Sequence, residues 1–205
     1  MSSSALSNFV HIFLDHGREK TLFLLHGTGG DERDLIALVE PAQAAYNFVG
    51  LRGNVLEGGL PRFFARSAPG VFDQLSIATE SDKLAEFLKA WYTKHELPVE
   101  QSAFVGFSNG ANMLLATLLR HPEVIQHAAL LHPMQVIEPP EVDLAGKRIL
   151  VTYGLGDTML PAGAGQQVAA DLEARGAQVT VFSHSGGHQI TAGEQAALLD
   201  FLASR

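Results

Sequence analysis

The chain has 205 residues, of which 46% are hydrophobic and 18% are charged, a balance that supports a folded core and excludes intrinsic disorder. Its 22 acidic and 14 basic residues give a net charge of −8 without any cluster of Lys and Arg, which argues against a nucleic-acid-binding surface. The absence of cysteine excludes disulfides, thiolate nucleophiles and cysteine-ligated metal sites.

Short apolar runs alternate along the chain with segments of helical period. This rhythm predicts an α/β protein with a mostly parallel, doubly wound sheet that carries helices on both faces. A short polar interval separates the first two runs, Phe9–Leu14 and Thr21–Leu25, so we expect an antiparallel hairpin at one edge of the sheet. The later runs are apolar without alternation and are predicted to be buried strands: Phe48–Leu51, Ala103–Phe107, Ala128–Leu131, Ile149–Tyr153 and Val179–Phe182.

Helical segments with apolar stripes are predicted around Leu84–Trp91, Leu114–Leu119, Val168–Leu172 and Ala196–Leu202. We expect the second to end at His121, because a proline follows, and the third to end at Gly176, which tolerates a left-handed conformation. No repeat or linker interrupts the pattern, so we expect one domain over residues 1–205. The chain shows neither a secretory signal nor an apolar stretch of the ~18 residues that a membrane span needs.

The segment of residues 52–73 has no clear period and is punctuated by glycine and proline. Loops of this length are uncommon in compact domains and are often functional. We therefore take Leu56, Phe63 and Phe64 as candidate substrate contacts. The alternative, that these side chains only fasten a long loop to the core, is equally supported.

The most informative motif is Gly106-Phe107-Ser108-Asn109-Gly110, which lies between a predicted buried strand and a predicted helix. The pattern Gly-x-Ser-x-Gly in this context is typical of a sharp turn that lifts a nucleophilic serine above a sheet. Small neighbours are needed because the turn is tight. The alternative is a glycine-rich turn with an ordinary surface serine, and the strand and helix on either side favour the nucleophile.

A serine nucleophile needs a base, and the base needs an orienting carboxylate. His188 follows two glycines after the last predicted strand, where its loop would lie on the same rim of the sheet as Ser108. Asp157 leaves the preceding strand in another glycine-rich loop, which gives the chain order Ser, Asp, His. The rival carboxylates are Glu138, Glu141 and Asp143. We interpret His132 and most other histidines as structural or solvated.

Acyl transfer also needs N–H donors aimed at the oxyanion. The backbone N–H of Asn109, directly after the serine, is one candidate. Thr28 is the other, because Gly27 and Gly29 free the backbone to point amides at a ligand. This loop lacks the lysine and the full glycine pattern of a phosphate-binding loop, so that alternative is weak.

Together these motifs resemble the phospholipase/carboxylesterase family of the α/β-hydrolase superfamily, which includes acyl-protein thioesterases. The matching segments are Leu25–Asp31, Gly106–Gly110, Gly154–Asp157 with Pro161, and Gly187-His188. Further similarity in residues 52–64 and in Leu131–Met134 points to the small bacterial carboxylesterases. The resemblance implies the α/β-hydrolase fold, a serine esterase that uses Ser108, Asp157 and His188, no cofactor, and often a homodimer.

We therefore expect a cytoplasmic serine carboxylic-ester hydrolase that forms a covalent acyl-enzyme with short to medium acyl esters. No metal, nucleic acid or membrane partner is expected, and the stretch between Leu131 and Lys147 is too short for a cap domain. A thioesterase or lysophospholipase with the same residues, and a non-catalytic ligand-binding protein, stay open as alternatives. Arg52 and Arg62 either bind an anionic substrate group or pair with acids such as Glu57, and pairing is favoured.

Overall fold

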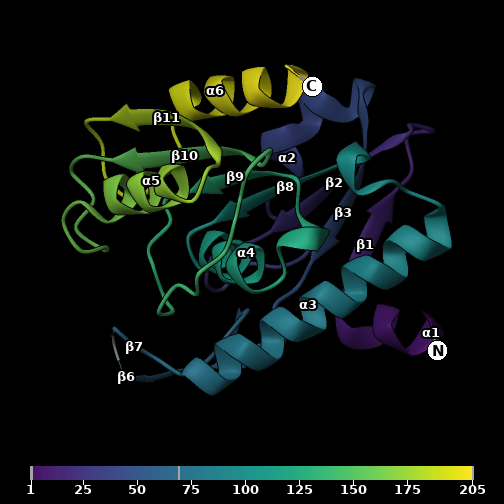
Figure 1. Ribbon diagram of the computed structural model, residues 1–205, viewed down its shortest axis with the longest axis horizontal. Coiled ribbons are helices and arrows are strands. Elements are labelled where there is room, and N and C mark those ends of the chain that lie inside the picture. The colour runs from purple at the N-terminus through teal and green to yellow at the C-terminus, as the bar shows by residue number, and fades with distance from the viewer. Residues whose placement is uncertain (1, 69, 205) are drawn as a thin grey trace.

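The structure, a computed structural model, describes residues 2–68 and 70–204 and is built on a seven-stranded sheet (Figure 1). Met1, Pro69 and Arg205, which the sequence predictions above include, lie outside these residues. In spatial order the strands are β1 (His11–Leu14), β3 (Tyr46–Leu51), β2 (Lys20–Leu25), β8 (Ser102–Phe107), β9 (His127–Leu131), β10 (Arg148–Gly154) and β11 (Gln178–His184). Only β1 runs antiparallel to its neighbour.

The predicted edge hairpin is wrong, because β1 pairs with β3 and not with β2. The side chain of Asn47 explains the difference. Its Oδ1 accepts hydrogen bonds from the backbone N–H groups of His16 and Arg18 at 2.8 and 3.0 Å, and its Nδ2 donates to the Arg18 carbonyl. These bonds hold the loop after β1 against the start of β3, and β2, which is apolar from Leu22 to Leu25, lies inside the sheet.

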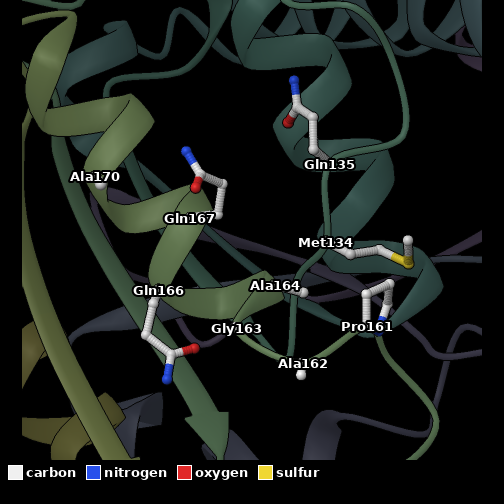
Figure 2. A pocket seen from close by; sticks show the side chains of 9 residues that line it. All are labelled: Met134, Gln135, Pro161, Ala162, Gly163, Ala164, Gln166, Gln167 and Ala170. Carbon is white, nitrogen blue, oxygen red and sulfur yellow. The ribbon is translucent and has the colours of Figure 1, made fainter.

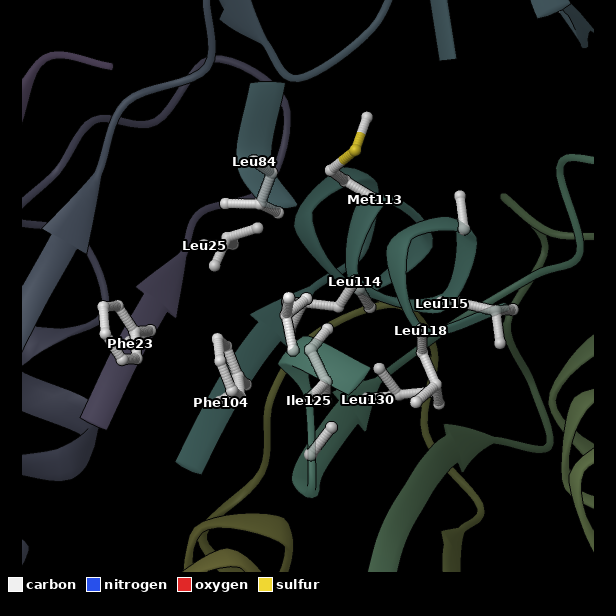
Figure 3. Close-up of a cluster of buried hydrophobic side chains, with 14 of the residues drawn as sticks. Phe23, Leu25, Leu84, Phe104, Met113, Leu114, Leu115, Leu118, Ile125 and Leu130 are labelled. Atoms are coloured by element: carbon white, nitrogen blue, oxygen red, sulfur yellow. The ribbon is translucent and has the colours of Figure 1, made fainter. Parts of the chain in front are cut away.

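Helices cover both faces of the sheet, as the sequence predicts (Figure 1). One face packs against α3 (Gln74–His95), α4 (Asn109–Arg120) and α5 (Ala164–Ala174). The other packs against α2 (Ile36–Val39) and α6 (Ala192–Ala203). Figure 3 shows part of the larger core, where Phe23 and Phe104 of β2 and β8 gather with Leu114 and Leu118 of α4. Neighbouring residues of each inner strand thus face opposite cores.

Two predicted helix ends are confirmed. α4 stops at Arg120 with His121 as its cap, and Gly176 follows α5 with a φ of +90°. The expectation for the last strand is wrong, because β11 lies at the edge of the sheet and most of its residues are exposed or half-buried. An edge strand has a neighbouring strand on one side only, so its residues stay more accessible than those of an inner strand.

The segment of residues 52–73 contains two small antiparallel pairs. β4 (Val55–Glu57) pairs with β5 (Leu60–Arg62), and β6 (Arg66–Ala68) pairs with β7 (Val71–Phe72). The other short elements are the helix α1 (Ser2–Ala5) and the 3₁₀ helices η1 (Leu6–Asn8), η2 (Glu40–Ala44), η3 (Val99–Gln101) and η4 (Pro122–Val124). Residues 132–147, all described, hold no helix or strand, so no cap domain covers this end of the sheet. Within residues 2–68 and 70–204, none of the helices has both the length and the apolar character that crossing a bilayer requires.

Candidate active site

Ser108 sits in a strained turn between β8 and α4. Its φ of 50° and ψ of −112° are unusual for a residue with a side chain, and its N–H donates to the Leu131 carbonyl at 2.8 Å. A Cβ on Gly106 would lie 2.7 Å from the Ala111 nitrogen, and a Cβ on Gly110 would lie 2.2 Å from the Leu25 oxygen. A side chain at either position would clash with the backbone, so both must be glycine. This steric requirement explains the Gly-x-Ser-x-Gly pattern.

The structure brings together the three side chains that sequence analysis selected. His188 Nε2 lies 2.8 Å from Ser108 Oγ, and His188 Nδ1 lies 2.6 Å from Asp157 Oδ2. Both contacts join residues far apart in the chain. An imidazole hydrogen-bonded in this way to a hydroxyl and a carboxylate can take a proton from the hydroxyl and be stabilised as a cation.

The loops that carry Asp157 and His188 pack directly against each other. The Gly156 N–H donates to the Gly186 carbonyl at 2.9 Å, and a Cβ on Gly154 would lie 2.4 Å from that same oxygen. Glycine at these positions lets the two loops approach closely enough for carboxylate and imidazole to meet. Glu138, Glu141 and Asp143 have no contact with His188 among the described residues, so the geometry favours Asp157 over its rivals.

Burial raises the pKa of Asp157, but hydrogen bonds from His188, the Met159 N–H and His132 outweigh it, so the pKa lies below its usual value. The Asp157 side chain is 6% exposed and therefore poorly screened by solvent. A carboxylate that stays ionised behind the imidazole suits the role of an orienting and stabilising anion.

A buried histidine that sequence reasoning assigned to the structural or solvated class touches this carboxylate. His132 is fully buried at the end of β9 with a φ of +53°, and its Nδ1 lies 3.2 Å from Asp157 Oδ2. Its Nε2 lies 3.0 Å from Glu194 Oε1 without hydrogen-bond alignment, so we treat that contact as an ion pair. His132 thus lies between two carboxylates directly behind the Asp157–His188 pair.

Glu194 anchors this network from the first turn of α6. It is fully buried, accepts hydrogen bonds from Thr152 Oγ1 at 2.7 Å and the Thr191 N–H at 2.9 Å, and lies 3.0 Å from His184 Nε2. Thr191 and Glu194 form a reciprocal capping box. The Thr-x-x-Glu spacing before an apolar run was the sequence signal that could have located Glu194.

The charges in this network support one another. Burial raises the pKa of Glu194, but the contact with His132 and the hydrogen bonds from Thr152 and Thr191 lower it to about 2. Burial lowers the pKa of His132, but Glu194 and Asp157 outweigh burial and raise it. The arrangement therefore favours an imidazolium at His132 between two carboxylates.

Two sets of three side chains place possible metal-ligand atoms within 4.8 Å of one another: His132, Asp157 and His188, and His132, His184 and Glu194. In both sets the carboxylate oxygens already accept hydrogen bonds from protein donors. These bonds account for both clusters without an ion. That no metal takes part stays a prediction.

The two candidate oxyanion donors are held by the same short segment. Asn109 occupies the first position of α4, where a helix leaves its N–H groups without an intrahelical acceptor. Its Oδ1 accepts a hydrogen bond from the Phe63 N–H at 2.7 Å. Thr28 Oγ1 accepts from Arg62 Nη1 at 3.0 Å, and the neighbouring Gly29 N–H donates to Pro61 at 2.9 Å. Residues 61–63 therefore fix both loops around Ser108.

A cavity of about 470 Å³ opens onto Ser108. Its lining residues are Thr28, Arg62, Arg66, Gly70, Phe72, Ser108, Asn109, Asn112, Met134, Thr158, Met159, Leu160, Pro161 and His188. A larger cavity of about 640 Å³ does not include Ser108 but shares Met134 and Pro161 with the first. In Figure 2 these two side chains lie at one end of the larger cavity, and Gln167 and Ala170 of α5 lie opposite.

The structure corrects the candidate substrate contacts. Phe63 and Phe64 are fully buried in the core, and Leu56 is 70% exposed, so none of the three lines the cavity at Ser108. Phe72 and Leu160 supply apolar lining instead, together with two methionines. The reason is that the backbone of residues 61–64 runs beside Ser108 while the aromatic rings point into the core.

The predicted pairing of the two arginines is confirmed, with different partners. Arg52 contacts Glu32 at 2.6 Å, whereas Arg62 lies 3.3 Å from Glu57. Arg62 also lines the cavity.

A mostly parallel sheet with helices on both faces and a serine in a strained strand-to-helix turn places the molecule in the α/β-hydrolase class. Residues 13–205 match the sequence profile of the family described as Phospholipase/Carboxylesterase. The chain belongs to this family.

Relatives of known name agree with this assignment. "Putative hydrolase MhqD" from Bacillus subtilis is 35% identical over 182 residues, which cover 88% of this chain and 91% of the relative. The carboxylesterase of Bacillus cereus superposes with a TM-score of 0.90 at 32% identity, over 99% of this chain and 98% of its own. That of Mesorhizobium loti superposes with a TM-score of 0.90 at 33% identity, over 97% and 96%. The chain is an enzyme of the carboxylesterase type.

Proposed function

We propose that this protein hydrolyses short to medium acyl esters of small molecules through Ser108, His188 and Asp157 and a covalent acyl-enzyme. The observation that carries the proposal is the continuous contact from Ser108 Oγ to His188 Nε2 at 2.8 Å and from His188 Nδ1 to Asp157 at 2.6 Å. A hydroxyl in this position can be deprotonated as it attacks, which an isolated serine at neutral pH cannot.

In the acylation half-reaction, His188 Nε2 takes the Ser108 proton while Oγ bonds to the ester carbonyl carbon. The carbonyl π electrons move onto oxygen and form a tetrahedral oxyanion. The backbone N–H groups of Asn109 and Thr28 donate to this oxygen, each worth roughly 3 kcal/mol of barrier stabilisation. The intermediate collapses as the carbon–oxygen bond to the alcohol breaks, and His188 gives the alcohol its proton.

Deacylation repeats the route with water. His188 takes a proton from the water as its oxygen bonds to the acyl carbon, and collapse of the second intermediate returns the proton to Ser108 Oγ. Asp157 keeps the imidazole in the right tautomer and stabilises its cation without accepting the proton. The N-terminus of α4, which begins at Asn109, adds a favourable potential for the negative oxygen.

The substrate size follows from the cavity. A volume of about 470 Å³ without a cap domain suits a small ester with a short or medium acyl group. One domain over residues 1–205, a cytoplasmic location and a homodimer stay predictions of the sequence.

The test compares wild type with Ser108→Ala on p-nitrophenyl acetate and butyrate. We expect kcat to fall by about 10⁴-fold or more, with fluorophosphonate labelling lost. Ser7→Ala, a substitution of an exposed serine in η1, serves as the control and should keep wild-type kcat. Unchanged hydrolysis in the Ser108 variant would refute the proposal. Faster turnover of acyl thioesters or lysophospholipids than of simple esters would reassign the substrate class.

A further inference from the structure

The cavity at Ser108 has one cationic wall. Arg62 and Arg66 line it, and among its described lining residues none is Asp or Glu. This sign is opposite to that of the whole chain, whose net charge is −8. A local cationic wall in an acidic protein attracts anionic ligands specifically to that place.

The two guanidinium groups share one carboxylate. Arg66 Nε lies 2.6 and 2.9 Å from the two oxygens of Glu57, and Arg62 Nε lies 3.3 Å from one of them. Glu57 does not line the cavity, and its side chain is 38% exposed. One partly solvated anion against two cations leaves a net positive charge at this wall.

Arg62 is the more deeply placed of the two. Its side chain is 5% exposed, and its Nε and Nη1 donate to the Phe64 carbonyl and to Thr28 Oγ1. Burial and the neighbouring Arg66 lower the pKa of Arg62, and Glu57 offsets this only in part. A buried cation with incomplete compensation is stabilised by any anion that enters the cavity.

Other parts of the lining are apolar and come from Met134, Met159, Leu160 and Pro161. Met134 and Pro161 also line the cavity of about 640 Å³ beside α5 (Figure 2). Ser108 and His188 line the same cavity as the arginines and these apolar side chains. An ester bound at Ser108 therefore has room for two chemically different groups.

We propose, on the basis of the function proposed above, that the preferred substrates are esters of two unlike groups. One of the two, the acyl or the alcohol group, carries a carboxylate that binds Arg62 and Arg66, and the group on the other side of the ester bond is apolar. Guanidinium groups suit this task because their planar N–H donors match the geometry of a carboxylate. The carboxylate supplies the counter-charge that Glu57 provides only in part.

A different role for Arg62 is separable from this one. Because Arg62 donates to Thr28, its replacement would disturb a candidate oxyanion donor and lower kcat for every ester. Within the described part of the chain, the Arg66 side chain forms hydrogen bonds and an ion pair with Glu57 and with no other residue. Arg66 and Glu57 are therefore the positions to vary.

The experiment uses two pairs of substrates; the members of each pair differ in charge but little in shape. Their hydrolysis is followed by pH-stat. Monoethyl succinate against ethyl succinamate places the charge on the acyl side, and 3-acetoxypropanoate against 3-acetoxypropanamide places it on the alcohol side. We expect one pair to show about tenfold higher kcat/KM for the anion, mainly through KM. High salt should reduce this preference.

Variants should move the preference in opposite directions. Arg66→Gln leaves Glu57 to neutralise Arg62 and should lower the anion-to-neutral ratio by about tenfold, whereas Arg66→Lys should keep most of it. Glu57→Gln removes the competing carboxylate and should raise the ratio. Arg18→Gln makes the same charge change at an exposed arginine between β1 and β2, away from the cavity, and is the control.

Equal kcat/KM within both pairs, failure to cleave either anionic ester, or an equal effect of Arg18→Gln and Arg66→Gln would overturn this proposal. If the neutral esters are still hydrolysed in a Ser108-dependent way, the proposed function survives that result. If hydrolysis of p-nitrophenyl butyrate does not depend on Ser108, the proposed function itself fails.

Discussion

At the scale of single residues, the position of His132 ties the candidate catalytic groups to the protein interior. Its imidazole shares Asp157 Oδ2 with His188, and the two rings are 5.0 Å apart. It lies behind the carboxylate, away from the reacting atoms. We therefore regard His132 as a positioning residue that holds Asp157 and adds positive potential beside His188.

This role predicts a change in pH dependence for His132→Asn. Losing a cation beside Asp157 and His188 should move the acid limb of kcat/KM to higher pH. His184→Gln is the matched control, because His184 contacts Glu194 without touching Asp157. The measurement is kcat/KM for p-nitrophenyl butyrate from pH 5 to 9. A uniform loss of activity at every pH would show a purely structural role.

Single residues also differ in whether the sequence alone can locate them. Ser108, Asp157 and His188 were predicted to lie together because glycine-rich loops after parallel strands gather at one rim of an α/β sheet, and the structure brings the three side chains into contact. His132 carries no local signal of this kind. Its role depends on a carboxylate that arrives from α6, and only the folded chain brings Glu194 behind it.

At the scale of elements, the sequence predicted the strands better than the order in which they pair. The alternation of apolar runs and helical stripes predicted the strands and the two-sided cover, but a short interval between β1 and β2 suggested a hairpin. The side chain of Asn47 decides otherwise by bonding the connecting loop across β3. A tertiary contact of this kind leaves no mark in the hydrophobic pattern.

Asn47→Ala should therefore cost stability more than activity. The substitution leaves two backbone N–H groups and a carbonyl without their partner, a loss of about 2 kcal/mol in the free energy of unfolding. Asn47 lies at the start of β3, whereas Ser108 follows the end of β8, so kcat/KM should change little. Urea unfolding measures the loss, and Gln43→Ala, at an exposed side chain nearby, is the control. Equal stability of the two variants would contradict this account of the pairing.

At the scale of the whole molecule, hydrophobic pattern and local motifs were enough for the fold class but not for the lining of the cavity. Phe63 and Phe64 are as apolar as a substrate contact would be, but both are buried in the core. The apolar walls come from separate segments, such as Phe72 and Leu160, that meet only in the folded protein. Composition alone cannot rank one apolar side chain above another for either use.

The buried charges also make global stability depend on pH. The pKa of Glu194 is about 2 in the folded protein and 4.5 by the ordinary value, so the folded state binds fewer protons than the unfolded chain between these limits. Glu194 therefore contributes stability above pH 4.5 that is lost as the pH falls toward 2, on the order of 3 kcal/mol. The raised pKa of His132 acts in the other direction, with stability present below 6.5 and lost as the pH rises through the folded value.

Glu194→Gln isolates the acid part of this profile. The variant should be less stable than wild type at pH 7, because the ion pair with His132 and the contact with His184 are gone. Between pH 4.5 and 2 it should lose less stability than wild type does, because it has no carboxylate to protonate. Urea unfolding at half-unit pH steps measures both slopes, with the exposed Glu141→Gln as the matched control. Parallel curves for wild type and Glu194→Gln through the acid range would mean that Glu194 does not control acid stability.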